Sequence, residues 1–156
     1  MLAEAADLSL PRTSQELRRL QSRGLVQAVR SGRWVRYRPV PDPQVPSAKP
    51  LLAAMKAALA RNSQEADAQT IRMAKAYSHQ RRLDIVRELL GGSCSVSQIQ
   101  SVTGIRGMAL FRHLRTLKKG GVVRRRGKCW ELAPNAHPLA KCMEGLLSPR
   151  RTTESK

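Results

Sequence analysis

The sequence has few aromatic, acidic and cysteine residues and no long apolar run. These shortages limit what its core can be made of and which classes of protein it can belong to. Aromatic residues make up 3% of the 156 residues, so a core must be built mainly from leucine, valine, isoleucine and alanine. Three widely spaced cysteines form neither a disulfide framework nor a CxxC zinc pair. No apolar run approaches the roughly 18 residues that a membrane-spanning helix needs, and the acidic start is unlike a signal peptide. We therefore expect a soluble, reduced, cytoplasmic protein with no membrane partner.

Motifs of common catalytic sites are also missing. The chain has no GxGxxG, phosphate-binding loop, GxSxG or HExxH motif. Its three histidines are scattered, and its 11 acids supply no obvious acid–base pair. We expect no enzymatic activity and no cofactor.

Basic residues are abundant, and the excess predicts a polyanionic partner. The 29 Lys and Arg residues outnumber the acids enough to give a formal net charge of +18. The excess is concentrated in two stretches without an acid: residues 17–41 hold seven arginines, and residues 89–130 hold nine bases, all within 106–128. Cationic side chains gain free energy on phosphate contact because counterions are released. Two such stretches predict two binding surfaces, or one surface repeated.

Two parts of the chain repeat each other at an offset of 97 residues. Each part predicts a helix that ends at a glycine in the left-handed region, then a strand, a basic turn with glycine, and a strand that contains tryptophan. The hairpin of the second copy is two residues shorter. The identical positions are Leu17, Arg18, Leu20, Gly24 and Val26 in the first copy, and Leu114, Arg115, Leu117, Gly121 and Val123 in the second.

The second copy predicts a complete folding unit. Residues 83–90 have the periodicity of an amphipathic helix, and Ser95-Val-Ser-Gln98 is a capping box that opens a short helix ending at 103–104. A second helix, 107–119, has leucines on one face and bases on the other. Two short helices joined by a tight turn, the second one basic, are a helix-turn-helix, and the hairpin after them is a wing. The fold class is therefore mainly α with small β-hairpin wings, a winged helix-turn-helix that is duplicated.

Residues 77–132 resemble the ArsR-type (arsenic-repressor-like) winged-helix transcriptional regulators. The resemblance rests on Arg-Arg-Leu-Asp-Ile-Val-Arg-Glu-Leu-Leu (81–90), Val-Ser-Gln-Ile (96–99), Arg-His-Leu-Arg-Thr-Leu-Lys-Lys-Gly-Gly-Val-Val (112–123) and the short wing. Residues 1–38 resemble the back part of the same domain. The resemblance implies a sequence-specific regulator of transcription that binds double-stranded DNA, and we expect a repressor. A non-specific basic nucleic-acid-binding protein and a degenerate winged-helix dimerisation module are the alternatives.

The repeat also divides the chain into parts. We expect a partial winged-helix unit with a proline-rich linker (1–47), a linking amphipathic helix (48–69), a complete domain (70–148) and a disordered tail (149–156). The alternating prolines of 39–47 predict a stiff, extended spacer. In the resembled family, helices that flank the winged unit form the dimer interface. Three helices would then form this interface: 49–60, 70–77 and 138–147. They would join either two copies within one chain, as a pseudo-dimer with recognition helices roughly 34 Å apart, or two chains, as a homodimer. Alternatively, these helices cap their own domain.

The first copy begins inside its positioning helix, because Met1 corresponds to Gln98. Its scaffold helices are missing, so we expect four apolar residues to lack a packing surface: Leu17, Leu20, Leu25 and Val26. Either the start is a truncation or a mis-assigned initiation codon, or a partner supplies the missing face.

The candidate DNA contacts are the outward positions of the two recognition helices and the bases of the two wings. In the second copy they are Arg106, Met108, Ala109, Arg112, His113, Thr116, Lys118 and Lys119, with Arg125, Arg126 and Lys128 in the wing. In the first copy they are Arg12, Ser14, Gln15 and Arg18, with Arg30, Arg33 and Arg36 in the wing.

These candidates have different expected roles. Arg112 is the best candidate for a bidentate guanine contact, whereas Arg106 and Lys119 suit phosphate contacts that position the protein. Phe111 is either a thymine-methyl contact or part of the core. In the first copy Glu16 stands where the second has a histidine, and an acid facing phosphates weakens binding unless it accepts a hydrogen bond from a cytosine amine.

Metal sensing in the resembled family depends on residues that this chain mostly lacks. One sensor site uses Cys-Val-Cys beside the positioning helix, but here the stretch is Cys94-Ser-Val-Ser. Another uses Asp and His residues on the last helix, where this chain has only His137, Cys142 and Glu144. We therefore expect no metal site. Cys129, among the bases of the wing, is the one candidate for a redox-sensitive thiol.

Overall fold

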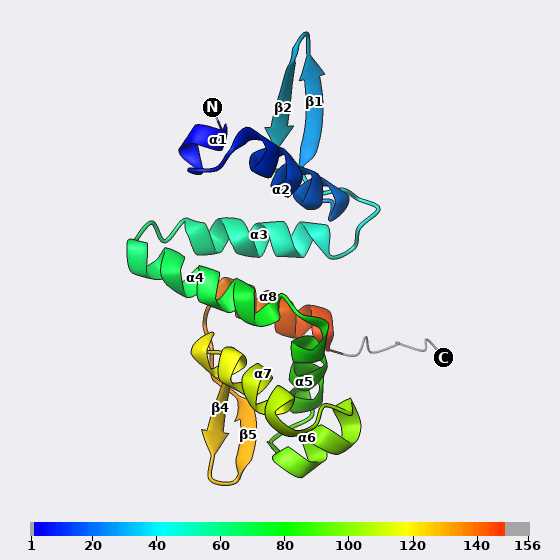
Figure 1. Cartoon of the computed structure of the whole chain (residues 1–156), viewed down its shortest axis with the longest axis vertical. Helices are drawn as coiled ribbons and strands as arrows, with labels where there is room; N and C mark the ends of the chain where they lie inside the picture. The colour runs from blue at the N-terminus through cyan, green and yellow to red at the C-terminus, as the bar shows by residue number, and fades with distance from the viewer. Residues whose placement is uncertain (1, 149–156) are drawn as a thin grey trace, which may run out of the picture. The chain divides into compact units, whose positions relative to one another are not determined.

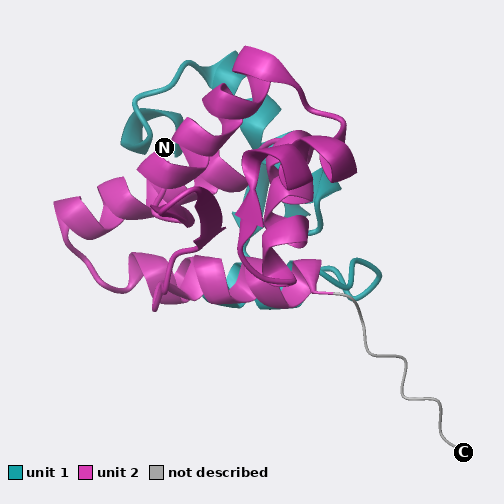
Figure 2. Ribbon diagram, turned by 90° about the horizontal axis from the view of Figure 1, so that it is seen from below, with its two compact units in different colours: residues 1–54 teal, residues 55–156 magenta. Residues whose placement is uncertain are grey.

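The computed structural model describes residues 2–148, and the chain divides into two compact units, residues 1–54 and 55–156 (Figures 1 and 2). The boundary lies within helix α3 (Ala48–Leu59). The predicted tail, 149–156, lies outside the described residues. Among residues 2–148, none of the helices combines the length and the apolar character that crossing a bilayer requires.

The first unit consists of short helices and one β-hairpin. Its elements are α1 (Leu2–Ala5), α2 (Leu10–Ser22), β1 (Gln27–Ser31), β2 (Trp34–Arg38) and the first part of α3. Ser9 caps α2, because its hydroxyl accepts a hydrogen bond from the Arg12 N–H at 3.4 Å. After α2, Gly24 has a φ of +69°, and the Leu25 N–H bonds back to the Leu20 carbonyl at 3.0 Å. β1 and β2 then pair antiparallel, as the sequence predicts.

The segment 39–47 folds back on the end of α2, so the prediction of a stiff, extended spacer is wrong. The Asp42 N–H donates to the Gly24 carbonyl at 2.8 Å, and the Asp42 carboxylate accepts from the Gln44 N–H at 2.9 Å. The approach is so close that a Cβ on Gly24 would lie 3.0 Å from Val45 Cγ2. The prolines fix only their own φ and remove only their own N–H, which leaves the residues between them free to form turns.

The four apolar residues of the first unit that were expected to lack a packing surface are partly covered. Leu25 is buried, contrary to that expectation. Leu17, Leu20 and Val26 are only half-buried.

The second unit is a winged helix-turn-helix, and the predicted fold class of helices with small β-hairpin wings is confirmed. Its elements are α4 (Gln64–Tyr77), α5 (Gln80–Leu90), β3 (Cys94–Ser95), α6 (Val96–Thr103), α7 (Gly107–Lys119), β4 (Val123–Arg126), β5 (Cys129–Leu132) and α8 (Pro138–Leu147). The strands form an antiparallel sheet in the order β3-β5-β4. The predicted capping box is present: the Ser95 hydroxyl accepts from the Gln98 N–H, and the Gln98 side chain accepts from the Ser95 N–H.

The core of this unit holds α7 by its apolar face. Leu110, Leu114 and Leu117 are fully buried, and α7 packs against α4 and α5. Gly120 brings the end of α7 so near α4 that an added Cβ would lie 2.6 Å from Ala76 Cβ. α8 packs against α4 and α5 as well. This support determines which face of α7 remains exposed.

The two units share local geometry at matching positions. α2 and α7 have the same length, and their bounds differ by the offset of 97. Gly24 and Gly121 have φ values of +69° and +71°. Asp7 and Gly104, also 97 apart, both have a positive φ, +51° and +66°. Such values are uncommon for a residue with a side chain.

Candidate nucleic-acid interface

The outer face of α7 displays the side chains that the sequence predicts as contacts. Arg106, Met108, Arg112, Lys118 and Lys119 are exposed, and Ala109, His113 and Thr116 are half-buried beside them. The tight turn before α7 is made by Gly104 in the left-handed region. Arg106 stands at the N-cap and makes no capping hydrogen bond, because a guanidinium has only donors and the exposed N–H groups of the helix need an acceptor.

The exposure of Phe111 decides whether this residue belongs to the core. Its side chain is 49% exposed, so the interpretation as a core residue is wrong. It lies on the outer face of α7 together with Met108, which is 70% exposed.

His113 lies beside a basic cluster made of His79, Arg81 and Arg82, which the sequence did not predict. Its ring is 4.9 Å from the ring of His79, which precedes α5, and the planes are tilted by 49°. Burial, followed by the charges of His79, Arg82 and Arg81, lowers the pKa of His113 below its ordinary value. The start of α5 therefore adds positive charge beside the middle of α7. The adjacent bases at 79–82 were the available signal, but only the packing of α5 on α7 shows that they reach His113.

Arg82 has a structural role within this cluster. Its Nε donates to the Ala76 carbonyl at 2.7 Å, and one Nη donates to the Lys75 carbonyl at 2.8 Å. These bonds satisfy carbonyls at the C-terminal end of α4, which have no partner within the helix. Arg81 is exposed.

The wing of the second unit has partly neutralised bases. Arg124 Nε donates to the Glu131 carboxylate at 2.6 Å, and Arg126 lies 3.7 Å from the other carboxylate oxygen. Arg125 Nε donates to the Gly127 carbonyl at 3.0 Å, which holds its side chain against the turn. Lys128 is exposed at the same turn.

Helix α2, the expected recognition helix of the first copy, differs from α7 in its charges. Glu16 forms ion pairs with Arg12 and Arg19, each at 3.0 Å, so this acid neutralises Arg12, one of the expected contacts. Ser14, Gln15 and Arg18 are exposed.

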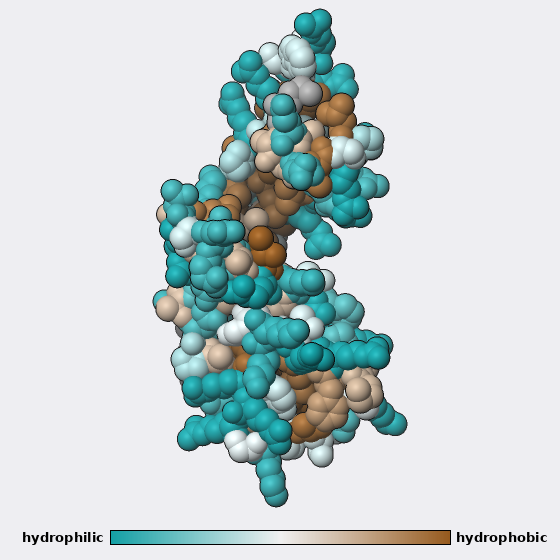
Figure 3. Space-filling view, turned by 60° about the vertical axis from the view of Figure 1, so that its left-hand side comes forward, coloured by the Kyte–Doolittle hydropathy of each residue, from teal (hydrophilic) through white to brown (hydrophobic). Residues whose placement is uncertain are grey.

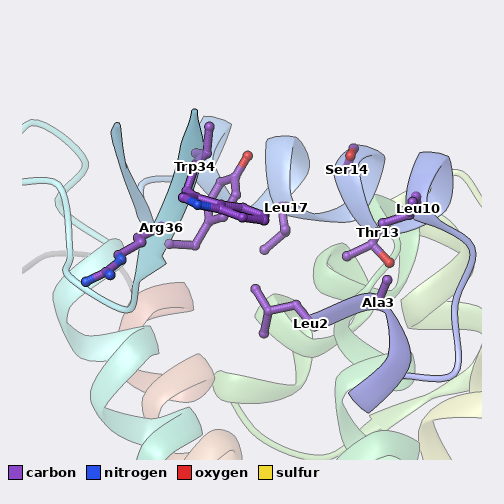
Figure 4. Close-up of a pocket in the computed structure, with 10 residues that line it drawn as sticks. Leu2, Ala3, Leu10, Thr13, Ser14, Leu17, Trp34 and Arg36 are labelled. Carbon is purple, nitrogen blue, oxygen red and sulfur yellow. The ribbon is translucent and has the colours of Figure 1, made fainter. Parts of the chain in front are cut away.

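The hairpin β1–β2, the expected wing of the first copy, lies beside an apolar groove of about 530 Å³. The groove is lined by Leu2, Leu10, Leu17 and Trp34, among others, and Figure 4 shows Leu2, Leu17 and Trp34 around the same space. Arg36, an expected DNA contact, also lines this groove. Arg33 lies over the Trp34 ring at 5.2 Å, and Arg30 is exposed.

The candidate metal ligands do not come together. Among residues 2–148, the structure has no group of three His, Cys, Asp or Glu side chains that could hold a metal ion. Burial raises the pKa of both the Cys94 and the Cys142 thiols, and Glu88 adds to the shift at Cys94. Such thiols are poor nucleophiles at neutral pH.

The face in Figure 3 carries mostly hydrophilic side chains, with apolar groups between them. The sign of the charge comes from the sequence, in which 29 Lys and Arg residues stand against 11 Asp and Glu residues. This excess of positive charge suits a polyanionic partner in water.

Comparison with known proteins gives a family match within the second unit. Residues 79–125 match the family described as bacterial regulatory protein, arsR family. These residues are an ArsR-family helix-turn-helix domain. The match includes α5, α6, α7 and most of β4, and therefore the outer face of α7. The ArsR-family domain is a DNA-binding module of a transcriptional regulator, and its partner is double-stranded DNA; it is not an enzyme.

One solved structure is also similar, HlyU from Vibrio cholerae N16961. It is 26% identical, and the match covers 54% of this chain and 94% of that chain, with a TM-score of 0.45. No curated protein matches the chain.

Proposed function

We propose that the protein is a sequence-specific repressor that inserts α7 into the major groove of double-stranded DNA in the cytoplasm. The observation that carries the proposal is the division of α7 into two faces. Three leucines hold it against α4 and α5, and the opposite face presents a series of bases without any acid. A helix that is rigidly supported and basic on its outer side fits the recognition helix of a helix-turn-helix.

The residues divide into reading and positioning contacts. Arg112 reads a guanine by a bidentate hydrogen bond, the commonest specific contact in the major groove. Arg106, His113, Lys118 and Lys119 contact phosphates and so set the register of the helix on the duplex.

Further contacts surround these residues. Ala109 and Thr116 complete the face of α7, and the wing adds Arg125, Arg126 and Lys128. Met108 also lies on this face.

The proposal is tested by fluorescence anisotropy with DNA from upstream of the protein's own gene and a scrambled duplex, from 50 to 300 mM salt. Sequence-specific regulation requires an affinity ratio of roughly 10³ or more that survives salt. Equal binding to both duplexes, lost steeply with salt, would instead show a non-specific basic protein. A reporter transcribed from the same DNA then distinguishes repression from activation.

A pair of charge-matched variants separates reading from positioning. Arg112→Ala should lower affinity for the native duplex about 10- to 100-fold while its affinity for the scrambled duplex changes little. The control is Arg87→Ala, which removes the same charge from an exposed arginine of α5 that pairs with Asp84. An equal loss on both duplexes for Arg112→Ala would contradict its reading role.

We further propose that the first unit is the back part of a second winged helix. The matched bounds of α2 and α7 and the positive φ at Asp7 and Gly104 support this arrangement. Its contacts would be Arg12, Ser14, Gln15 and Arg18, with Arg30, Arg33 and Arg36 in the wing. The pairing of Glu16 with Arg12 predicts weaker binding than at α7.

The helices at 49–60, 70–77 and 138–147 are the proposed pairing surfaces. Light scattering tests whether they pair within one chain or between two chains. A mass of 17.3 kDa with one chain per DNA site supports the pseudo-dimer within one chain, whereas twice that mass supports a homodimer.

A further inference from the structure

Two large apolar side chains are exposed on the outer face of α7. Met108 and Phe111 are one turn apart, and side chains three residues apart are neighbours on a helix surface. They are not left over from a crowded core, since Leu110, Leu114 and Leu117 already fill the buried face. Leaving two adjacent apolar side chains in water is unfavourable, and a partner that covers them removes that cost.

The surrounding charge determines what that partner is. Met108 shares its stripe of the helix with Arg112, and Phe111 shares its stripe with Arg115, because each pair is four residues apart. Both arginines are exposed, and α7 contains no acid. An apolar protein surface would have to desolvate these charges without pairing them, which is costly. DNA pairs them with phosphates and guanine edges while its grooves cover the apolar side chains.

One base edge in the major groove offers an apolar surface. The C5-methyl group of thymine is that surface, and the other edges present hydrogen-bond donors and acceptors. A phenyl ring has neither donor nor acceptor, and a thioether is only a weak acceptor. Placed against a polar edge, these side chains would displace water without replacing its hydrogen bonds.

We propose that Met108 and Phe111 read thymine methyl groups, next to the guanine read by Arg112. The inference rests on the proposed function, because it requires α7 in the major groove. At the matching positions α2 has Pro11 and Ser14, so the first unit lacks this apolar pair. The thymine preference therefore belongs to the half of the site that contacts α7.

Replacing thymine by deoxyuridine tests the inference, because the change removes the methyl group and keeps the pairing and hydrogen-bonding edges. Burying one methyl group changes affinity about fourfold, so two contacts should give a loss of roughly 15-fold on the deoxyuridine form of the native duplex. Anisotropy at one fixed salt concentration measures this ratio. The scrambled duplex, with and without the same replacement, is the DNA control.

Two variants assign the effect to these side chains. The double variant Met108→Ala, Phe111→Ala should bind the thymine and deoxyuridine duplexes alike. Val102→Ala, at an apolar residue of α6 that is 64% exposed and lies outside the proposed contacts, should keep the full ratio of the unmodified protein. Circular dichroism checks that both variants are folded.

Three results would overturn the inference. If the unmodified protein prefers the native duplex to the scrambled one but binds its thymine and deoxyuridine forms equally, the methyl contacts are wrong and the proposed function stands. If the double variant keeps the full ratio, other residues read the methyl groups. If the native and scrambled duplexes bind alike, the proposed function and the inference both fail.

Discussion

Acidification should destabilise the second unit through His137. This side chain is 3% exposed at the start of α8, where Nδ1 accepts a hydrogen bond from the Leu139 N–H at 3.2 Å. Nε2 lies 3.0 Å from the Thr70 hydroxyl oxygen, and that hydroxyl donates its own proton to the Ala66 carbonyl at 2.8 Å. Nε2 must therefore carry the hydrogen that it shares with Thr70, and Nδ1 must be unprotonated. This network accepts only the neutral imidazole.

The direction of the effect follows from the pKa. Burial, followed by the charge of Arg61, lowers the pKa of His137 below its ordinary value of 6.5. The unfolded chain therefore binds a proton at a pH where the folded chain does not, and stability that is complete above pH 6.5 is lost as the pH falls below it. One such group changes the free energy of unfolding by at most about 1.4 kcal/mol per pH unit. Between pH 7.5 and 5.5 we expect His137 to contribute a loss of up to about 1.4 kcal/mol.

Urea unfolding at these two pH values measures the loss. Trp130 fluorescence in a Trp34→Phe background reports on the second unit alone, because Trp34 is the tryptophan of the first unit. His137→Asn keeps a good capping residue that does not titrate, so its pH-dependent loss should be smaller by up to about 1.4 kcal/mol. His113, whose pKa is also lowered, remains in both proteins and cancels in the comparison.

A second variant separates titration from the hydrogen bond. Thr70→Val leaves the Nε2–H of His137 buried without its partner, which should cost about 1–3 kcal/mol at neutral pH. An unchanged pH dependence in His137→Asn would refute the reasoning, because it would show that the neutral imidazole is not what acid disrupts.

Packing and charge lead to three more expected outcomes. Gly120→Ala should lower the free energy of unfolding by about 1–3 kcal/mol, because its methyl would crowd Ala76; Gly145→Ala, which meets nothing within 4 Å, should be neutral or stabilising by up to about 1 kcal/mol. Urea unfolding of both checks this contrast, and similar values would contradict it. In thermal melts, Leu114→Ala should cost about 2–5 kcal/mol, and its half-buried counterpart Leu17→Ala less than about 1.5 kcal/mol. The logarithm of DNA affinity should fall with the logarithm of salt concentration with a slope of roughly −5 or steeper, and a flat dependence would exclude phosphate contacts as the source of affinity.

Local signals in the sequence were enough to predict much of the candidate site. The bounds of α7 match the predicted helix 107–119, and the capping box at Ser95 has both of its hydrogen bonds. Gly24 and Gly121 have the positive φ expected after each recognition helix. These features depend on residues within a few positions of each other, so helical periodicity, capping and glycine geometry are sufficient to define them.

Features that depend on distant residues were missed or left open. The proline pattern of 39–47 predicted an extended chain, but a hydrogen bond from Asp42 to Gly24 folds it back. Periodicity left Phe111 between the core and the surface until the packing of three leucines filled the buried face.

The sequence by itself therefore determined the helices, the wings, the charge and the family of the second unit, because each is encoded in local pattern or composition. Only the tertiary structure decided which distant side chains meet: His79 beside His113, and His137 on Thr70, 67 residues away. Glu16 lies four residues after Arg12 and three before Arg19 on α2, so its ion pairs follow from helix geometry alone. The histidine contacts arise when α5 and α8 pack against their neighbours, and free energies of packing are not encoded in any single segment.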